Sequence, residues 1–188
     1  MKRWFDIVVS STLLVALSPL YLIIFILVYL DIGWPVFEKQ RYPGMNEQWF
    51  TISRFRTMNR ACNEKGELLP ADQRLSVIGY YLKRFKLDHL PEFYNVLRGE
   101  MSLVGPRPGF IRSIPSKDVN LTRHSVCPGM TGWSQLHGKS LTWEEKLALD
   151  LYYVKHQSLW FDIKILVLSL GLLFIKKPLK VKITKKDE

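Results

Sequence analysis

The longest apolar run of the chain lies near its N-terminus. Residues 7–30 form 24 consecutive positions without a charged side chain. A helix of that length extends about 36 Å, enough to cross the hydrocarbon core of a bilayer. The run is too long for the apolar region of a cleaved signal peptide. Ser18 and Pro19 lie in its middle. Proline removes a backbone donor and clashes with the preceding turn, so the sequence predicts a kink there.

The charges beside this run favour a bent helix over a straight one. Lys2 and Arg3 precede it, and a basic region follows it. Basic flanks prefer the cytoplasmic side of a membrane, so a re-entrant hairpin would satisfy both ends. A straight transmembrane helix remains the alternative, because such helices tolerate proline.

A second apolar stretch covers residues 159–175. It is short for a span, and Asp162 and Lys164 interrupt it early. This pattern favours an amphipathic helix that lies in the membrane interface. A buried core helix is the alternative reading.

Between the two apolar stretches the pattern predicts mainly helix with one small β-hairpin. Val36–Phe37 and Trp49–Phe55 have strand character, and Tyr42–Asn46 between them has turn chemistry. Helices are expected over residues 72–85, over 88–97 with a stop at Gly99, and from a capping box at 142–145 to about His156. The expected organisation is a membrane helix over 1–33, a compact catalytic domain over 34–175 that includes an interfacial C-terminal helix, and a basic tail over 176–188.

The net charge of +10 indicates an anionic partner. Six lysines fall within residues 176–188, directly after the apolar stretch, which favours contact with anionic lipids over nucleic-acid binding. A frayed, solvated tail would show the same composition. Two cysteines without metal-ligand spacing indicate neither a disulfide framework nor a metal site. Other cations are scattered through the middle of the chain and suggest a positive pocket: Arg54, Arg56, Lys83, Arg84, Lys86, Arg107 and Arg112.

Candidate chemistry concentrates around Asp88. This residue suits the N-cap of the predicted 88–97 helix, where free N–H groups and the helix dipole would keep it ionised and attract a substrate phosphate. An ionised aspartate beside a phosphate could attack phosphorus, or it could simply cap the helix. In a regular helix Glu92 would share its face and help to hold Mg²⁺. His89 could donate to a phosphate, carry a proton, or be a surface or packing residue.

Two proline- and glycine-containing loops complete the set of candidates. Residues 105–108 place Arg107 between two prolines, and a preorganised guanidinium suits bidentate phosphate binding. Residues 128–132 form a tight loop of small residues where backbone could approach a nucleotide or sugar, or a plain turn. Each motif is weak by itself.

Several motifs in order resemble one family. The chain from Met1 to about Ile175 resembles the bacterial sugar transferases, monotopic polyprenyl-phosphate phosphoglycosyl transferases of the small, single-domain type. Members similar to this chain insert a re-entrant helix into one leaflet. The matching segments are Arg54–Met58, Leu87–Glu92, Asn95–Ser102, Gly105–Pro108 and Pro128–Gly132, together with the apolar N-terminal run and its Ser-Pro break.

The resemblance implies a reaction and its partners. The residue matching Asp88 would attack the sugar-linked phosphate of a UDP-sugar, UMP would leave, and polyprenyl phosphate would then take the phosphosugar from the aspartate, with Mg²⁺ neutralising the diphosphate. This is the first membrane step of bacterial glycan assembly, on the cytoplasmic face of the inner membrane. Downstream glycosyltransferases are possible partners, nucleic acid is not expected, and the sugar is left open. Beside the catalytic Asp88 and His89, the expected phosphate-binding residues are Arg56, Lys83, Arg84 and Arg107.

His89 is the main departure from the family pattern, which has glutamate after the aspartate. Three explanations compete: Glu92 replaces that glutamate at the metal, His89 contacts phosphate or metal in its own way, or catalysis is weakened. The last would make the chain a membrane scaffold that binds lipid phosphate and partner enzymes. An active enzyme is the preferred reading, because Asp88 and Arg107 are both present.

Overall fold

The computed structural model describes residues 1–109, 122–138 and 141–174. The predictions for the basic tail and for Arg112 lie outside these residues. The described part is mainly helical with a small antiparallel hairpin, as predicted, and adds a short parallel pair of strands.

The N-terminal apolar run forms two helices joined at a sharp bend. Helix α1 covers Lys2–Ala16, α2 covers Ser18–Ile32, and their axes differ by 62°. Pro19 lies in the first turn of α2, and the Ser18 hydroxyl donates to the carbonyl of Val15 at 2.8 Å. The predicted break is therefore confirmed. Among the described helices, none alone has the length and apolar content of a span, whereas this bent pair has both.

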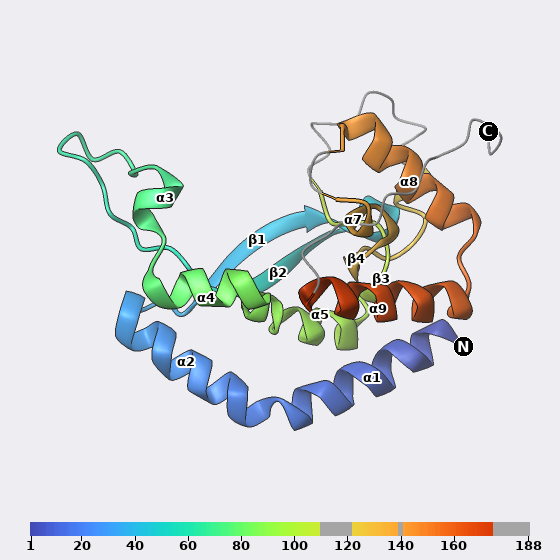
Figure 1. The fold of residues 1–188 in the computed structure, drawn as a ribbon, viewed down its shortest axis with the longest axis horizontal. Coiled ribbons are helices and arrows are strands. Elements are labelled where there is room, and N and C mark those ends of the chain that lie inside the picture. The colour runs from blue at the N-terminus through green and yellow to red at the C-terminus, as the bar shows by residue number, and fades with distance from the viewer. Residues whose placement is uncertain (110–121, 139–140, 175–188) are drawn as a thin grey trace.

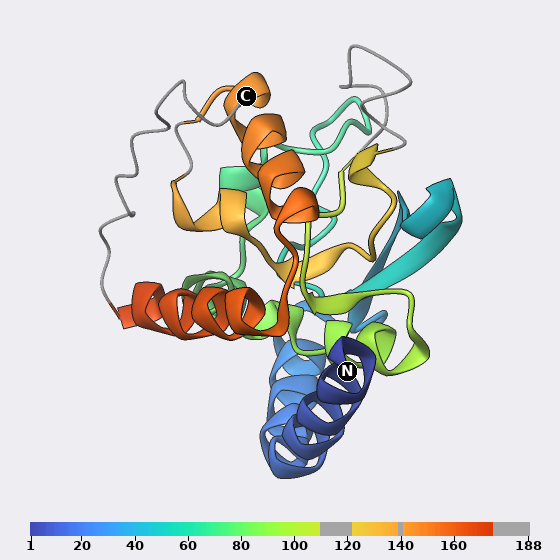
Figure 2. The same cartoon turned by 90° about the vertical axis from the view of Figure 1, so that its right-hand side faces the viewer.

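The bent pair lies on one side of the remaining chain. In Figure 1 it forms a V below the other elements, with the bend at the lowest point, and Figure 2 shows the same arrangement from the side. Helices α4 (Val77–Phe85), α5 (Glu92–Arg98) and α9 (Leu159–Phe174) lie at the base of the domain, nearest to this pair, in both views.

Polar side chains fasten α1 to the domain. Lys2 donates to Asp162 of α9 at 2.6 Å and to the Tyr153 hydroxyl at 2.8 Å. Arg3 donates to two of the last carbonyls of α5, those of Val96 at 2.5 Å and Leu97 at 2.6 Å. The buried carboxylate of Asp6 accepts from the Ser102 hydroxyl at 2.8 Å. The start of α1 is thus joined to the domain by hydrogen bonds and by the Lys2–Asp162 ion pair.

The hairpin consists of β1 (Phe37–Pro43) and β2 (Trp49–Phe55), paired from Phe37–Phe55 to Pro43–Trp49. A short 3₁₀ turn at Met45–Glu47 connects them. The predicted hairpin is confirmed, but its first strand is longer than expected. Residues 38–41 are polar and exposed, so they lack the apolar alternation by which a strand is recognised in sequence.

The single helix predicted over residues 72–85 is wrong. The chain forms α3 (Ala71–Arg74) and then α4, separated by two extended residues. Ser76 interrupts the helix because its hydroxyl accepts from the Gly79 N–H at 2.9 Å and caps α4. Serine favours this role over a helix interior.

The prediction of Asp88 as a helix N-cap is also wrong. Lys86 ends α4 in a left-handed conformation (φ 60°), and Asp88 lies within a 3₁₀ turn, Leu87–His89. Pro91 is the N-cap of α5, which ends at Gly99 (φ 83°) as predicted. From Lys86 to Tyr94 the backbone makes i→i+3 hydrogen bonds. In a 3₁₀ helix, side chains three residues apart are aligned. Asp88 and Glu92 are four residues apart, so they do not share a face as they would in a regular α-helix.

The C-terminal half supplies the rest of the core. Strands β3 (Ser102–Val104) and β4 (Gly129–Thr131) pair in parallel. Helix α7 covers Trp133–Leu136, and α8 covers Trp143–Lys155 with the predicted capping box. Helix α9 buries Ile165 and Asp162. On its other side, Trp160, Val167 and Leu170 are exposed by 82%, 63% and 60%. The helix is confirmed, and its place at a membrane interface stays a prediction.

Candidate active site

Asp88 lines a cavity beside the β1–β2 hairpin. The residue is 8% exposed, and its Oδ1 atom is buried without a hydrogen-bond partner. A buried acceptor without a partner costs free energy, so the Asp88 carboxylate is held in an unfavourable environment beside the cavity. The cavity has a volume of about 270 Å³, and its lining residues are Glu38, Gln40, Ile52, Arg54, Phe55, Thr57, Met58, Lys83 and Asp88.

A chain of hydrogen bonds leads from the hairpin to His89. Arg54 Nε donates to Glu92 Oε1 at 2.5 Å, and His89 Nδ1 contacts the same oxygen at 2.7 Å. Glu92 is 2% exposed. An ionised carboxylate only accepts, so Nδ1 must carry the hydrogen. His89 Nε2 then faces Asp88, 3.7 Å from its Oδ2 atom, which is too long for a hydrogen bond.

These contacts determine the charge of Glu92. Burial raises the pKa of the carboxyl, but the hydrogen bond and charge of His89 and the charge of Arg54 outweigh burial, so the pKa lies below its usual value of 4.5. Burial lowers the pKa of the Arg54 guanidinium, whereas Glu92, Tyr42 and Asp88 raise it to above its usual value. Glu92 and Arg54 therefore form a charged pair beside the cavity.

The structure brings together some predicted residues and separates others. Lys83 and Asp88 line the same cavity, and His89 and Glu92 adjoin Asp88. Arg54, one of the scattered cations and the first residue of a family-matching segment, lies on β2 of the hairpin and links it to Glu92.

Arg56 and Arg84 are not part of that lining. Arg56 is 8% exposed and donates to the carbonyl of Met58 at 3.0 Å. Burial and the charge of Arg60 lower the pKa of its guanidinium. Arg84 is exposed and lies over the ring of Phe85. Phosphate binding by these two arginines stays a prediction.

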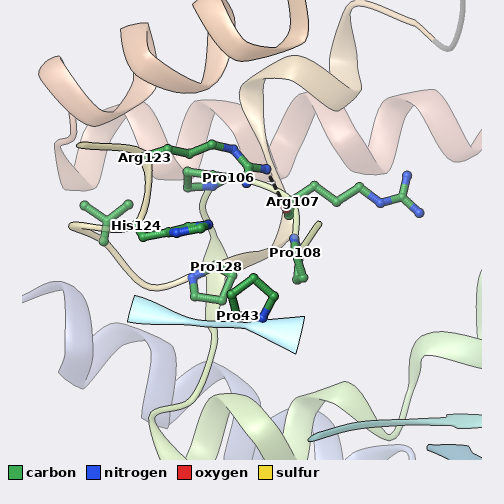
Figure 3. Close-up of a pocket in the computed structure, with 8 residues that line it drawn as sticks. Pro43, Pro106, Arg107, Pro108, Arg123, His124 and Pro128 are labelled. Atoms are coloured by element: carbon green, nitrogen blue, oxygen red, sulfur yellow. Dashed lines mark hydrogen bonds between the residues drawn. The ribbon is translucent and has the colours of Figure 1, made fainter. Parts of the chain in front are cut away.

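Arg107 lies at a separate, smaller cavity of about 10 Å³, which has room for about one water molecule. Figure 3 shows its side chain pointing away from the prolines and from His124. Its backbone carbonyl accepts from Arg123, which also pairs with the buried Asp150 at 2.9 Å. The loop is thus fixed from α8 while the guanidinium stays exposed. Phosphate binding by Arg107 also stays a prediction.

Two cavity residues were missed from the sequence. Glu38 and Gln40 line the cavity. They lie in the part of β1 that lacks an apolar pattern, and they belong to no recognisable sequence motif. Only the pairing register with β2 places them there, and a single sequence carries no signal for that register.

Magnesium would have to share its ligands with the substrate. Among residues 1–109, 122–138 and 141–174, no three His, Cys, Asp or Glu side chains form a ready metal site. Mg²⁺ commonly uses only one or two carboxylates together with substrate phosphates and water, so Asp88 and Glu92 are suitable ligand types. Both close contacts of Glu92 use Oε1, and neither uses Oε2. Metal binding by Glu92 stays a prediction.

Comparison with known proteins gives the family. Residues 1–176 match the family model described as bacterial sugar transferase. The chain is 39% identical to the protein named uncharacterized sugar transferase EpsL of Bacillus subtilis, over 96% of this chain and 90% of that protein.

Two other relatives carry names that state a reaction. The chain is 36% identical to undecaprenyl-phosphate glucose phosphotransferase of Komagataeibacter xylinus, over 90% of this chain. It is 35% identical to UDP-glucose:undecaprenyl-phosphate glucose-1-phosphate transferase of Escherichia coli K12, over 94% of this chain. It spans only 35% and 41% of these two longer proteins. The match over nearly its whole length confirms what the ordered motifs predicted: this chain belongs to the bacterial sugar transferase family.

Proposed function

We propose that this chain transfers a sugar phosphate from a UDP-sugar to a polyprenyl phosphate, with Asp88 as the nucleophile. The observation that carries the proposal is the Asp88 carboxylate, which lines the 270 Å³ cavity with one buried oxygen unpartnered. The names of the two relatives above, which include undecaprenyl phosphate as the acceptor, support the same reaction.

The reaction proceeds in two displacements at one phosphorus. An oxygen of Asp88 bonds to the phosphorus that carries the sugar, and the bond from that phosphorus to the bridging oxygen of the diphosphate breaks. UMP leaves with the electron pair. An oxygen of polyprenyl phosphate then bonds to the same phosphorus, the Asp88–phosphorus bond breaks, and the carboxylate is regenerated. Splitting the transfer into two steps is the advantage of a covalent nucleophile.

Neighbouring side chains assist this carboxylate. Lys83 and Arg54 line the same cavity and supply positive charge for the diphosphate. Glu92 holds His89 by Nδ1, so that Nε2 lies beside the phosphoryl group that Asp88 receives. Mg²⁺, when bound, would neutralise charge on the diphosphate, with Asp88 or Glu92 Oε2 as its protein ligand.

The test uses the full chain in lipid nanodiscs with Mg²⁺, undecaprenyl phosphate and a panel of UDP-sugars. UMP release is measured, and intact mass is recorded without acceptor. The wild type is expected to release UMP and to gain the mass of one phosphosugar. Asp88→Asn is expected to gain no phosphosugar mass. Its rate of UMP release is expected to be more than about 10³-fold lower, as when other enzymes lose their nucleophile. Asp72→Asn, an exposed acid on α3, is the matched control. Full turnover by Asp88→Asn would disprove the covalent step. A wild type that releases no UMP with any sugar would favour the scaffold alternative.

We further propose that the α1–α2 pair is re-entrant and that the domain faces the cytoplasm of the bacterial inner membrane. The 62° bend and the base layer formed by α4, α5 and α9 support this arrangement, with the exposed apolar side of α9 in the interface. Single cysteines at Arg3 and Trp34, in a chain with both native cysteines replaced by serine, test it. An impermeant maleimide should label both positions from the cytoplasmic side only. Labelling from opposite sides would establish a spanning helix instead.

A further inference from the structure

The hairpin supplies a polar wall of the 270 Å³ cavity, and two residues of this wall, Glu38 and Gln40, have no part in the proposed chemistry. Glu38 and Gln40 alternate along β1, and their direct partners across the hairpin are Arg54 and Ile52. Residues that face each other across an antiparallel pair point to the same side of the sheet. All four line the cavity, so one face of the hairpin forms this wall, while Asp88 and Lys83 come from the helical side.

Hydrogen bonds connect the polar side chains of β1 in one direction. The Tyr42 hydroxyl donates to Gln40 Oε1 at 2.5 Å, and Gln40 Nε2 donates to Glu38 Oε1 at 3.0 Å. This order fixes the orientation of the Gln40 amide. The series ends on a carboxylate, which only accepts hydrogen bonds. The wall therefore offers an acceptor to whatever occupies the cavity.

Charge decides which part of a nucleotide-sugar can lie against this wall. A diphosphate is repelled by the Glu38 carboxylate and attracted to Lys83 and Arg54, and it must lie at Asp88 to react. The part left for Glu38 and Gln40 is uncharged and rich in hydroxyl donors. Carboxylates accept from hydroxyl groups, so the chemistry of the wall matches that of a sugar ring.

The size of the cavity indicates which part of a UDP-sugar it can hold. The cavity volume of about 270 Å³ lies below the range of about 300–1,000 Å³ of cavities that enclose a drug-sized ligand. The space suits a phosphosugar better than a whole UDP-sugar. The uridine portion would then lie outside this cavity.

We infer that Glu38 and Gln40 bind hydroxyl groups of the transferred sugar and select among UDP-sugars. This inference rests on the proposed function. A site that hydrogen-bonds a substrate hydroxyl discriminates against a sugar that lacks it or points it elsewhere, because the buried or oriented acceptor is then left unpaired. Glu38 and Gln40 are exposed without ligand, so the discrimination should be smaller than in a fully enclosed site.

The experiment compares kcat and KM of the wild type, Glu38→Gln and Gln40→Ala across UDP-glucose, UDP-galactose and their N-acetylated amino-sugar counterparts, which differ at single ring positions. Glu38→Gln is expected to raise KM for the preferred sugar about 10–100-fold with kcat changed less than about threefold. The kcat/KM ratio between epimers should fall towards one. Glu64→Gln, an exposed acid in a loop outside the cavity lining, is the matched control and should change neither value.

Inhibition by UMP distinguishes the sugar from the nucleotide. UMP lacks the transferred sugar, so its inhibition constant should stay the same in Glu38→Gln. An equal loss of affinity for UMP and for UDP-sugars in Glu38→Gln would mean that the wall binds the nucleotide, and it would overturn the inference. Unchanged selectivity between epimers would also overturn it.

Binding without turnover separates this inference from the proposed function. Calorimetry on Asp88→Asn, with and without Glu38→Gln, measures the affinity for each UDP-sugar directly. A sugar-dependent loss supports the inference even if UMP release depends on another nucleophile, and an equal affinity in the two backgrounds overturns it. Circular dichroism and thermal unfolding of Glu38→Gln should match the wild type, since the side chain keeps its size.

Discussion

Removing Arg54 should destabilise the chain much more than its partial exposure suggests. The Arg54 side chain is 25% exposed, whereas its partner Glu92 is 3% exposed. In Arg54→Met the carboxylate stays buried and loses its cation. Breaking a buried ion pair from one side costs about 3–5 kcal/mol. His89 still contacts Glu92 Oε1, so we expect the lower end, about 3 kcal/mol.

The melting temperature gives the readout. For a chain of this size, 1 kcal/mol changes Tm by about 2–4 °C, so Arg54→Met should lower Tm by about 6–12 °C. The assay is thermal and denaturant unfolding in nanodiscs at pH 7, followed by circular dichroism. Arg98→Met removes a cation from an exposed pair with Glu100, where the Arg98 side chain is 58% exposed, and should cost less than about 1 kcal/mol.

A double-mutant cycle identifies the cause. Glu92→Gln in the Arg54→Met background removes the unpaired charge and keeps an acceptor for His89, so the double variant should be more stable than Arg54→Met alone by about 2 kcal/mol. The reasoning is refuted if Arg54→Met costs no more than the Arg98 control, or if the two substitutions simply add.

Two further predictions concern acid stability and glycine packing. Because the folded-state pKa of Glu92 is depressed, its contribution to stability is complete above about pH 4.5 and is lost as the pH falls through the folded-state pKa. The Tm of Glu92→Gln should therefore decline less than that of the wild type below about pH 4.5, and parallel declines would contradict this. Gly79→Ala should destabilise by about 1–3 kcal/mol, because its Cβ would lie 2.0 Å from the Thr57 carbonyl oxygen. Gly171→Ala, in α9 with no atom within 4 Å, should instead gain up to about 1 kcal/mol from helix propensity, and equal effects at the two sites would refute the packing argument.

Features of the fold that depend on one residue and its chain neighbours were predictable. Proline dictates the break at Pro19, the capping box dictates the start of α8, and glycine ends α5 at Gly99. Each follows from backbone hydrogen bonding within one turn. The position of Ser76 as a cap was not recognised, because serine inside an apolar 3.6-residue pattern can equally lie on the exposed face of a continuous helix.

The candidate site was predictable in composition and less so in geometry. The sequence points to Asp88, His89 and Glu92 as the chemical residues, and the resemblance to the family gives them an expected role. Their mutual arrangement depends on the left-handed Lys86 and on i→i+3 winding, which align His89 with Glu92. The contact of Glu92 with Arg54 spans 38 residues, and such pairing is fixed only when the hairpin packs against α5.

The hydrogen bonds from Arg3 to the end of α5 fix the distance between α1 and the helix that follows Asp88. Helix α5 begins four residues after Asp88, and its last carbonyls accept hydrogen bonds from the Arg3 guanidinium. In the proposed membrane arrangement, the depth of α1 would therefore set the height of the Asp88 carboxylate above the acyl chains. In that proposed arrangement, a change in bilayer thickness would move α1 and Asp88 together, and an acceptor phosphate at the headgroup level would meet Asp88 at a constant height.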